Sequence, residues 1–371
     1  MADAQRRTAL LDIFVNRDYA LYDQIRTASQ PPNSSPIKHT PDNWPLVDDF
    51  RLYVKRDLQA QIWSQSIGGA SAPETASIDP YAKGFKDVAP VQVWGGAVGN
   101  GPGQMMAPHG IAVAPDGSIY VADSLNHRVV KFDQQGQFIV SFGGPNPDTQ
   151  PGLFREPWGV AVAPDNSLYV ADTWNYRMQK FTPDGALIQV WGVNTDTIGT
   201  AIGGEGGFYG QRGVAIDATG RVFVADTGNK RVQIFDANGQ FISQFGGGGL
   251  QPGQLDEPVG IAVDPKGNSV VADTWNGRVQ VFDSNGQSIA SWDINGWLDK
   301  NAVGKPYLAV DPQQRVYVSD AIGRRILVFD ITGKYLGSFG QYATDATGFS
   351  LPSGIAVDKE GYIYVVDTDT A

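Results

Sequence analysis

The chain has 371 residues, among them 45 glycines and no cysteine, and 28 lysines and arginines face 39 aspartates and glutamates. This glycine content is typical of a turn-rich β protein rather than of a disordered chain. The lack of cysteine excludes disulfides and thiolate metal sites. No stretch of 18 apolar residues occurs, so we expect no membrane span, and no apolar run resembles a signal peptide.

The negative charge lies mostly after residue 88. Residues 1–88 carry 10 basic and 11 acidic side chains, which leaves 18 basic and 28 acidic ones, a net charge of −10, for residues 89–371. A surface this acidic repels phosphate groups. Nucleic acid is therefore not expected as a partner.

The first 66 residues are expected to form a mainly helical N-terminal segment. Apolar residues in 7–27 and 48–63 follow the spacing of amphipathic helices. Residues 67–88, rich in Gly, Ala and Ser at first, are predicted to be a linker. Two interpretations stay open: the helices pack on the domain that follows, or they form a neck toward a part outside this chain.

From residue 89 onward, one sequence unit recurs in five full copies and a partial sixth. A fixed period in this range indicates an array of supersecondary units. The unit is marked by an aspartate that returns at steps of 49, 54, 47, 47 and 47 residues, at Asp123, Asp172, Asp226, Asp273, Asp320 and Asp367.

Each unit predicts four short strands. In the first copy they are 110–114, 119–122, 128–132 and 138–142, separated by turn residues such as Gly136. Four-stranded units repeated around an axis are propeller blades. We therefore expect an all-β, six-bladed β-propeller with four-stranded blades over residues 89–371.

The closure of the ring is expected to join its two ends. The sixth copy has two strands, 354–357 and 362–366, but no third. Residues 91–95 match the end of the other copies, and are predicted to supply the outer strand of the last blade and so to protect its edge. The source of the third strand stays open, because 84–87 fits it poorly.

An aspartate and an arginine five residues later recur in five copies. Five identical catalytic sites in one ring are implausible, whereas a charged hydrogen bond across a hairpin would fix each blade. These structural pairs are Asp123 with Arg128, Asp172 with Arg177, Asp226 with Arg231, Asp273 with Arg278, and Asp320 with Arg325.

Positions that differ between copies are the better candidates for a binding site. One set begins each first strand and should rim the channel; the other follows each marker aspartate on the hairpin. Tryptophans on turns are usual anchors of binding surfaces and suit sugar rings, although they can instead cover neighbouring loops. The candidate ligand-binding residues are His109, Trp158, Trp174, Tyr176, Arg212 and Trp275.

The repeat resembles the NHL repeat of TolB-like six-bladed propellers. The resemblance extends over residues 90–371 and is weakest at Asp320–Arg325. It implies the propeller fold, but such folds host unrelated functions. It is carried by Ala-Asp-Ser-Leu-Asn-His-Arg-Val at 122–129 and its counterparts at 171–178, 225–232 and 272–279.

A second resemblance concerns the first 81 residues. Segments 9–17, 49–58, 61–63 and 79–81 resemble the soluble C-terminal region of bacterial membrane glycosyltransferase-type proteins. These are dolichyl-phosphate-mannose mannosyltransferase-like and related to archaeal flippase-associated glycosylation proteins. The resemblance implies a soluble, extracytoplasmic fragment tethered by a membrane part outside this chain, where the catalytic part would lie, and a glycan or lipid-linked sugar as ligand.

Enzymatic signals are few. Amidating-lyase propellers carry the same Pro-His-Gly as this chain has at His109, and use three such histidines to hold zinc. Here Trp158, Arg212, Val259 and Ser353 occupy the other positions, so too few ligands remain for a catalytic zinc. No motif of a serine hydrolase, P-loop or zinc protease occurs. No cofactor is predicted, and calcium in the channel stays open.

The sequence therefore predicts a non-catalytic, monomeric module that binds a protein partner, a glycan or a lipid-linked sugar. Two alternatives remain. The chain could be a free-standing scaffold for protein–protein contact, or a propeller hydrolase or lyase with a metal in its channel.

Overall fold

The computed structural model describes residues 79–88, 90–95, 98–194, 204–297, 305–343 and 348–368. The predicted N-terminal helices, and most of the predicted linker, lie outside these residues. No helix among the described residues is long and apolar enough to cross a membrane.

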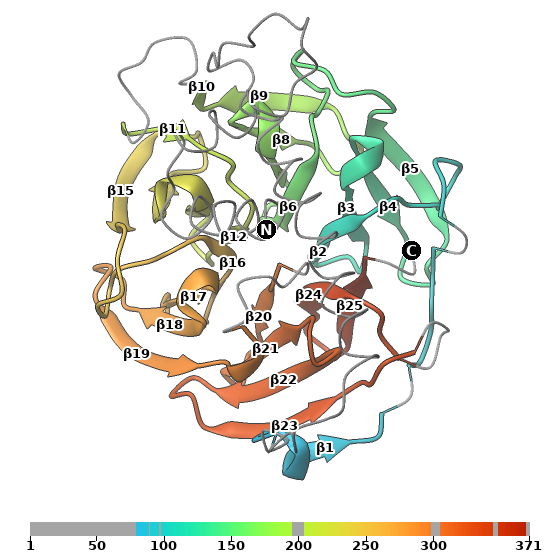
Figure 1. Cartoon of the computed structure of the whole chain (residues 1–371). Coiled ribbons are helices and arrows are strands. Elements are labelled where there is room, and N and C mark those ends of the chain that lie inside the picture. Colours follow the sequence, from blue (N-terminus) through green and yellow to red (C-terminus); the bar gives the residue numbers. More distant parts are fainter. Residues whose placement is uncertain are drawn as a thin grey trace, which may run out of the picture. The chain divides into compact units, whose positions relative to one another are not determined.

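The described strands form five antiparallel blades around a common centre (Figure 1). Blade one consists of β2 (Pro108–Val113), β3 (Ile119–Asp123), β4 (Arg128–Phe132) and β5 (Phe138–Gly143). Blade two consists of β6 (Pro157–Val162), β7 (Leu168–Asp172), β8 (Arg177–Phe181) and β9 (Leu187–Trp191). Blade three consists of β12 (Val214–Ile216), β13 (Val222–Asp226), β14 (Arg231–Phe235) and β15 (Phe241–Gly246). Blade four consists of β16 (Pro258–Val263), β17 (Ser269–Asp273), β18 (Arg278–Phe282) and β19 (Ser288–Asp293), and blade five of β20 (Leu308–Val310), β21 (Arg315–Asp320), β22 (Arg325–Asp330) and β23 (Tyr335–Phe339).

Each blade buries its middle strands, and blades one to four leave their outer strand partly exposed. All five residues of β3 are buried, whereas β5 begins with two exposed residues. The reason is that neighbouring blades cover both faces of a middle strand. Short strands β10 (Val193–Asn194) and β11 (Gly207–Phe208) pair in parallel between blades two and three.

The prediction of six four-stranded blades is wrong, because the described residues form five. The sixth copy contributes a sheet of two strands, β24 (Pro352–Val357) and β25 (Ile363–Asp367). This sheet lies between blades five and one: Thr368 Oγ1 donates a hydrogen bond of 2.9 Å to the Pro108 carbonyl, and Ile355 joins a core cluster with Ala309 of blade five.

The segment expected to complete the sixth blade is irregular in the structure. Residues 91–95 form no strand, although Gln92 Nε2 donates to the Gln135 carbonyl at 2.6 Å and the Trp94 ring lies 5.8 Å from that of Tyr364. Their contacts are therefore side-chain contacts. The two-stranded sheet has no third strand among the described residues.

Residues 79–86 bind to blade five instead of forming part of a linker. Strand β1 (Phe85–Lys86) pairs in parallel with β23, as the fifth strand of that sheet. Just before it, the Tyr81 side chain is buried against Phe329, with ring centroids 6.0 Å apart. Asp79 accepts hydrogen bonds of 2.5 and 3.0 Å from the two terminal nitrogens of Arg325.

The inner strands approach one another too closely for a side chain at one position of each. A Cβ atom on Gly110 would collide with the Trp158 carbonyl of blade two, and one on Gly354 with the His109 carbonyl of blade one. Neither glycine has a left-handed backbone, so space and not conformation requires glycine here. The same contact recurs at Gly159, Gly213 and Gly260.

The aspartate–arginine pairs bind each hairpin to the loop that enters its blade. Asp123 Oδ2 accepts from Arg128 Nε at 2.7 Å and from Asn126 Nδ2 at 2.8 Å, while its Oδ1 accepts the Met106 amide at 2.6 Å. The remaining guanidinium nitrogens donate to backbone carbonyls, such as that of Gln104 at 2.7 Å. Such charged hydrogen bonds offset the cost of burying both ions. The other four pairs lie at 2.7–3.0 Å.

Replacing Gly213 by alanine tests the contact between inner strands. If only chain entropy mattered, this change would raise the free energy of unfolding by about 0.4–1 kcal/mol. Because the new methyl group would meet the Val259 carbonyl, we expect a loss of about 1–3 kcal/mol instead. Urea unfolding followed by tryptophan fluorescence gives the sign, and a stabilised variant would contradict the contact.

Blade five allows the buried and the exposed partner of one arginine to be compared. The Asp320 side chain is fully buried, whereas that of Asp79 is 40% exposed. We expect Asp320→Ala to lower the free energy of unfolding by about 3–5 kcal/mol, and Asp79→Ala by about 1 kcal/mol or less. Equal losses in urea unfolding would show that burial does not set the strength of these pairs.

Candidate binding site

Both sets of candidate residues lie at the same end of the channel. Strand β2 begins at Pro108, which pairs with Asp123 at the end of β3, so His109 and the hairpin after Asp123 share one face. The opposite end of a six-residue strand is roughly 17 Å away. We call the cluster on this face the aromatic mouth; it is formed by His109, Trp158, Arg212, Glu257, Lys305 and Tyr307.

The centre of the aromatic mouth is a stack of side chains from blades one, two and three. The rings of His109 and Trp158 lie face to face with centroids 3.8 Å apart, and the Arg212 guanidinium carbon lies 4.6 Å from the Trp158 ring. His109 Nδ1 lies 2.9 Å from Ser124 Oγ. Burial and the positive charge of Arg212 lower the pKa of His109 to about 3, so this imidazole is neutral near pH 7.

A carboxylate from blade four joins this stack to blade five. Glu257 Oε1 accepts from Arg212 Nη1 at 2.9 Å and from Lys305 Nζ at 2.6 Å. Burial favours a higher pKa for Glu257, but the charges of Lys305 and Arg212 outweigh it and hold the pKa below its ordinary value. The residue has a left-handed backbone, with φ of 50°, which is uncommon for a residue other than glycine.

The contacts continue outward to a hairpin tryptophan. The ammonium group of Lys305 lies 5.8 Å from the centre of the Trp275 ring, within the range of a cation–π interaction. Trp275 itself is half-buried on η7 (Thr274–Asn276). A continuous series of contacts therefore leads from His109 beside the channel to the outer face.

One tyrosine crosses the channel. Tyr307, just before β20 of blade five, donates a hydrogen bond of 3.2 Å to the Trp158 carbonyl of blade two, and the inner strands of these blades lie across the centre from each other (Figure 1). Burial raises the pKa of Tyr307, so the phenol keeps its proton. Tyr307 takes the position that is Gly110 in blade one.

The other two candidate residues have contacts outside the aromatic mouth. Trp174 Nε1 donates to Glu156 Oε2 at 3.0 Å. The Tyr176 side chain is buried, and its ring stacks on that of Tyr209 with centroids 5.9 Å apart. The structure thus brings His109, Trp158, Arg212 and Trp275 into one series of contacts, and places Trp174 and Tyr176 beside it on the same face.

Sequence comparison between copies does not single out Glu257 or Lys305, and it gives Tyr307 only as an alternative to Pro306 for the rim position of blade five. A signal was present for two of them: Glu257 is an acidic residue directly before the first-strand proline, and Tyr307 replaces a glycine that the other copies keep. The third, Lys305, stands in blade five where the other copies have the first-strand proline or, in blade three, Gln211. Lys305 takes part in the cluster because its side chain extends to Glu257 of the neighbouring blade. The spacing of residues in the sequence does not predict this contact.

Within the part of the chain that the structure describes, three buried polar atoms of the aromatic mouth have no hydrogen-bond partner. They are Trp158 Nε1, Arg212 Nε and Glu257 Oε2. A buried polar atom without a partner costs about 1–3 kcal/mol. A bound group that both donates and accepts hydrogen bonds would satisfy them if these side chains shift. Within the described ranges, no three His, Asp or Glu side chains are grouped so that they could hold a metal ion.

The low pKa of His109 predicts a loss of stability in mild acid. The folded state resists protonation below pH 6.5 while the unfolded state does not, so this contribution is complete above pH 6.5 and is lost as the pH falls toward 3. We expect the free energy of unfolding to fall by up to about 1.4 kcal/mol per pH unit more steeply than in His109→Gln. Urea unfolding between pH 7 and 4 measures both slopes, and identical slopes would contradict the burial of a neutral imidazole.

Comparison with known proteins agrees with this architecture. Residues 106–132, 154–181, 212–235 and 255–282 match the NHL repeat family. The chain is 48% identical over 54 residues to the protein brain tumor of Drosophila melanogaster, a match over 15% of this chain and 5% of that protein. The chain therefore spans a small part of the length of this relative.

Solved structures share the fold at low sequence identity. A virginiamycin B lyase from Staphylococcus aureus superposes with a TM-score of 0.50 and 14% identity, over 73% of this chain and 79% of the lyase. A gluconolactonase from Xanthomonas campestris superposes with a TM-score of 0.51 and 15% identity, over 71% of this chain and 84% of the lactonase. At such identities the similarity shows the fold alone. The chain carries NHL repeats on a β-propeller fold.

Proposed function

We propose that this chain is a non-catalytic binding module, and that a protein partner binds to the face around the aromatic mouth. The observation that carries the proposal is the series of contacts from His109 through Trp158, Arg212 and Glu257 to Lys305. It joins five blades through positions at which the repeat copies differ.

The fold itself does not require aromatic or charged residues at these positions. The equivalent position is Val259 in blade four and Ser353 in the sixth copy, and both are almost completely buried. Small side chains therefore satisfy the packing of the ring. His109, Trp158 and Arg212 add chemistry that the packing does not need, which is the pattern of a recognition surface.

The face around the aromatic mouth offers apolar contact area to a partner. Leu125 and Ile322, each close to half exposed, lie on the hairpins of blades one and five. Charged side chains of both signs surround them, and we expect the partner segment to carry apolar residues and charges that complement these groups. Among the described residues outside the buried aspartate–arginine pairs, the cations include Arg155, Arg212, Lys230, Lys305 and Arg324, and the anions include Asp148, Glu156, Glu205, Asp256 and Glu257.

Site-specific crosslinking tests the location of the partner. The photoreactive residue p-benzoylphenylalanine would replace Leu125 or Ile322 on the face of the aromatic mouth, and Ile242, 48% exposed on outer strand β15, as the matched control. In extracts of the source cells we expect one protein to crosslink from the first two positions and not from the third. Introducing Arg212→Gln with Lys305→Gln should reduce that yield at least about tenfold.

Two results would contradict the proposal. Crosslinking that is equal from all three positions, or insensitive to the double substitution, would remove the partner from this face. A saturable change in tryptophan fluorescence with an oligosaccharide, abolished by Trp174→Ala and Trp275→Ala together, would instead assign the face to a glycan. The association with a membrane glycosyltransferase-type protein stays a prediction, since residues 1–78 carry most of that resemblance.

A further inference from the structure

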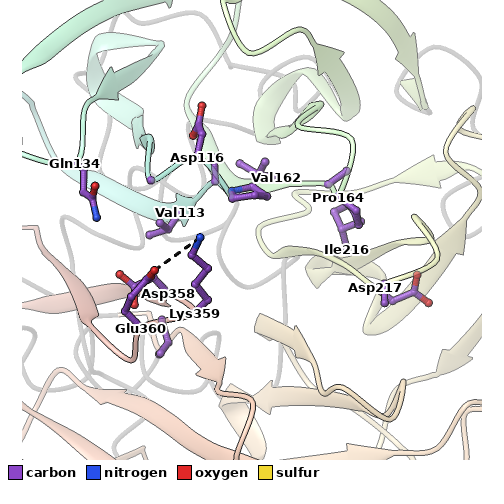
Figure 2. Close-up of a pocket in the computed structure, with 16 residues that line it drawn as sticks. Val113, Asp116, Gln134, Val162, Pro164, Ile216, Asp217, Asp358, Lys359 and Glu360 are labelled. Atoms are coloured by element: carbon purple, nitrogen blue, oxygen red, sulfur yellow. Dashed lines mark ion pairs between the residues drawn. The ribbon is translucent and has the colours of Figure 1, made fainter.

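A second candidate site lies at the opposite end of the channel. A cavity of about 570 Å³ opens there among the turns that follow the inner strands of blades one, two and three and of the sixth copy (Figure 2). Cavities of about 300–1,000 Å³ are typical of ligand sites. The roughly 17 Å length of an inner strand separates this cavity from the aromatic mouth.

The walls of the cavity are apolar. Val113, Val162, Ile216 and Val357, the last residues of their inner strands, line it and are each half-buried. Filling the cavity would remove the exposed parts of these side chains from water, which is favourable by about 25 cal/mol per Å². The same side chains also pack against the cores between the blades, so only their outward parts are available to a ligand.

The rim of the cavity is acidic. Four carboxylates line it against one cation, Lys359, which lies 3.7 Å from Glu360. Two of the carboxylates have structural roles, since Asp217 bonds to Arg221 Nε at 2.7 Å and Asp358 accepts the Tyr362 amide at 2.8 Å. Asp116 accepts the Ser118 amide at 2.9 Å and Glu360 pairs with Lys359, but both side chains are solvent-exposed, and Figure 2 shows them on different sides of the opening.

The surrounding surface extends this negative charge. The turn between the third and fourth strands of each blade lies on the same face, because Phe132 at the end of β4 pairs with Ile119 at the start of β3, and Ile119 pairs with Val113. A cationic partner is therefore attracted to the cavity from a distance, in a manner that salt screens. Each of these turns carries one carboxylate: Asp133, Asp184, Asp236, Asp283 and Asp330.

We propose that this cavity binds a basic peptide segment of a partner protein. One apolar side chain of the segment fills the cavity between Val113, Val162 and Ile216. Lysines or arginines on either side of that anchor pair with Asp116 and Glu360 at the rim. The proposal needs both features: the apolar walls bind the anchor side chain, and the carboxylates of the rim favour cationic residues on either side of that anchor. This site is independent of the partner proposed for the aromatic mouth.

Fluorescence polarisation with the whole chain and a fluorescein-labelled peptide, Arg-Lys-Leu-Lys-Arg, tests the proposal. We expect saturable binding that weakens at least about tenfold between 50 and 300 mM salt, and that weakens similarly when serine replaces the leucine. Absence of saturable binding at 50 mM salt would overturn the proposal. Equal binding of the leucine and serine peptides would do so too, since it would show attraction to the acidic face without use of the cavity.

Matched variants locate the peptide. Asp116→Asn with Glu360→Gln should weaken binding about tenfold or more, and Val162→Lys, which puts a cation into the cavity, should abolish it.

The control is Asp184→Asn with Glu205→Gln, which changes the net charge by the same amount at exposed positions outside the cavity and should change binding less than about twofold. If the control weakens binding as much as the rim pair, or if Arg212→Gln with Lys305→Gln abolishes it, the assignment to this cavity is wrong. Unchanged urea unfolding of each variant confirms that binding and not folding was altered.

Discussion

The inner strands of neighbouring blades touch through their backbones at one glycine in each strand. Gly110 lies against the Trp158 carbonyl, and Gly354 lies against the His109 carbonyl. This approach brings the residue before each glycine within reach of the next blade. The stacking of His109 on Trp158, and of Arg212 on Trp158, follows from it. The same spacing that closes the ring thus assembles a recognition surface from separate repeats.

The buried aspartate–arginine pairs hold the hairpins of the blades in place. In blades one to four, each fixes the hairpin between the second and third strands to the loop that enters the blade, and the second residue after the marker aspartate, such as Leu125 in blade one, lies on the face of the aromatic mouth. Blade five shows how the pattern can be altered: Asp79 supplies carboxylate oxygens to Arg325, where the other blades use backbone carbonyls. The segment at 79–86 is thereby made part of blade five rather than left as a tether.

Much of this arrangement is predictable from the sequence, because each copy of the repeat forms the same strands and the same local contacts. The strands, the facing of Asp123 and Arg128, and the common face of His109 and Trp275 follow from period and register. The number of complete blades does not, since residues 91–95 match a strand in composition without pairing as one. The ion pairs of Glu257 with Arg212 and Lys305 cannot be predicted from the sequence either, because they depend on how far three side chains extend across blade boundaries.

Blade five differs from the other copies at one position beside the channel. Tyr307 stands where the other copies have glycine, and its hydroxyl spans the channel to the Trp158 carbonyl. Its burial keeps the phenol neutral and its bond intact across the physiological pH range. The aromatic mouth and the acidic cavity are therefore two separate candidate sites, at opposite ends of the inner strands whose glycine contacts form the ring.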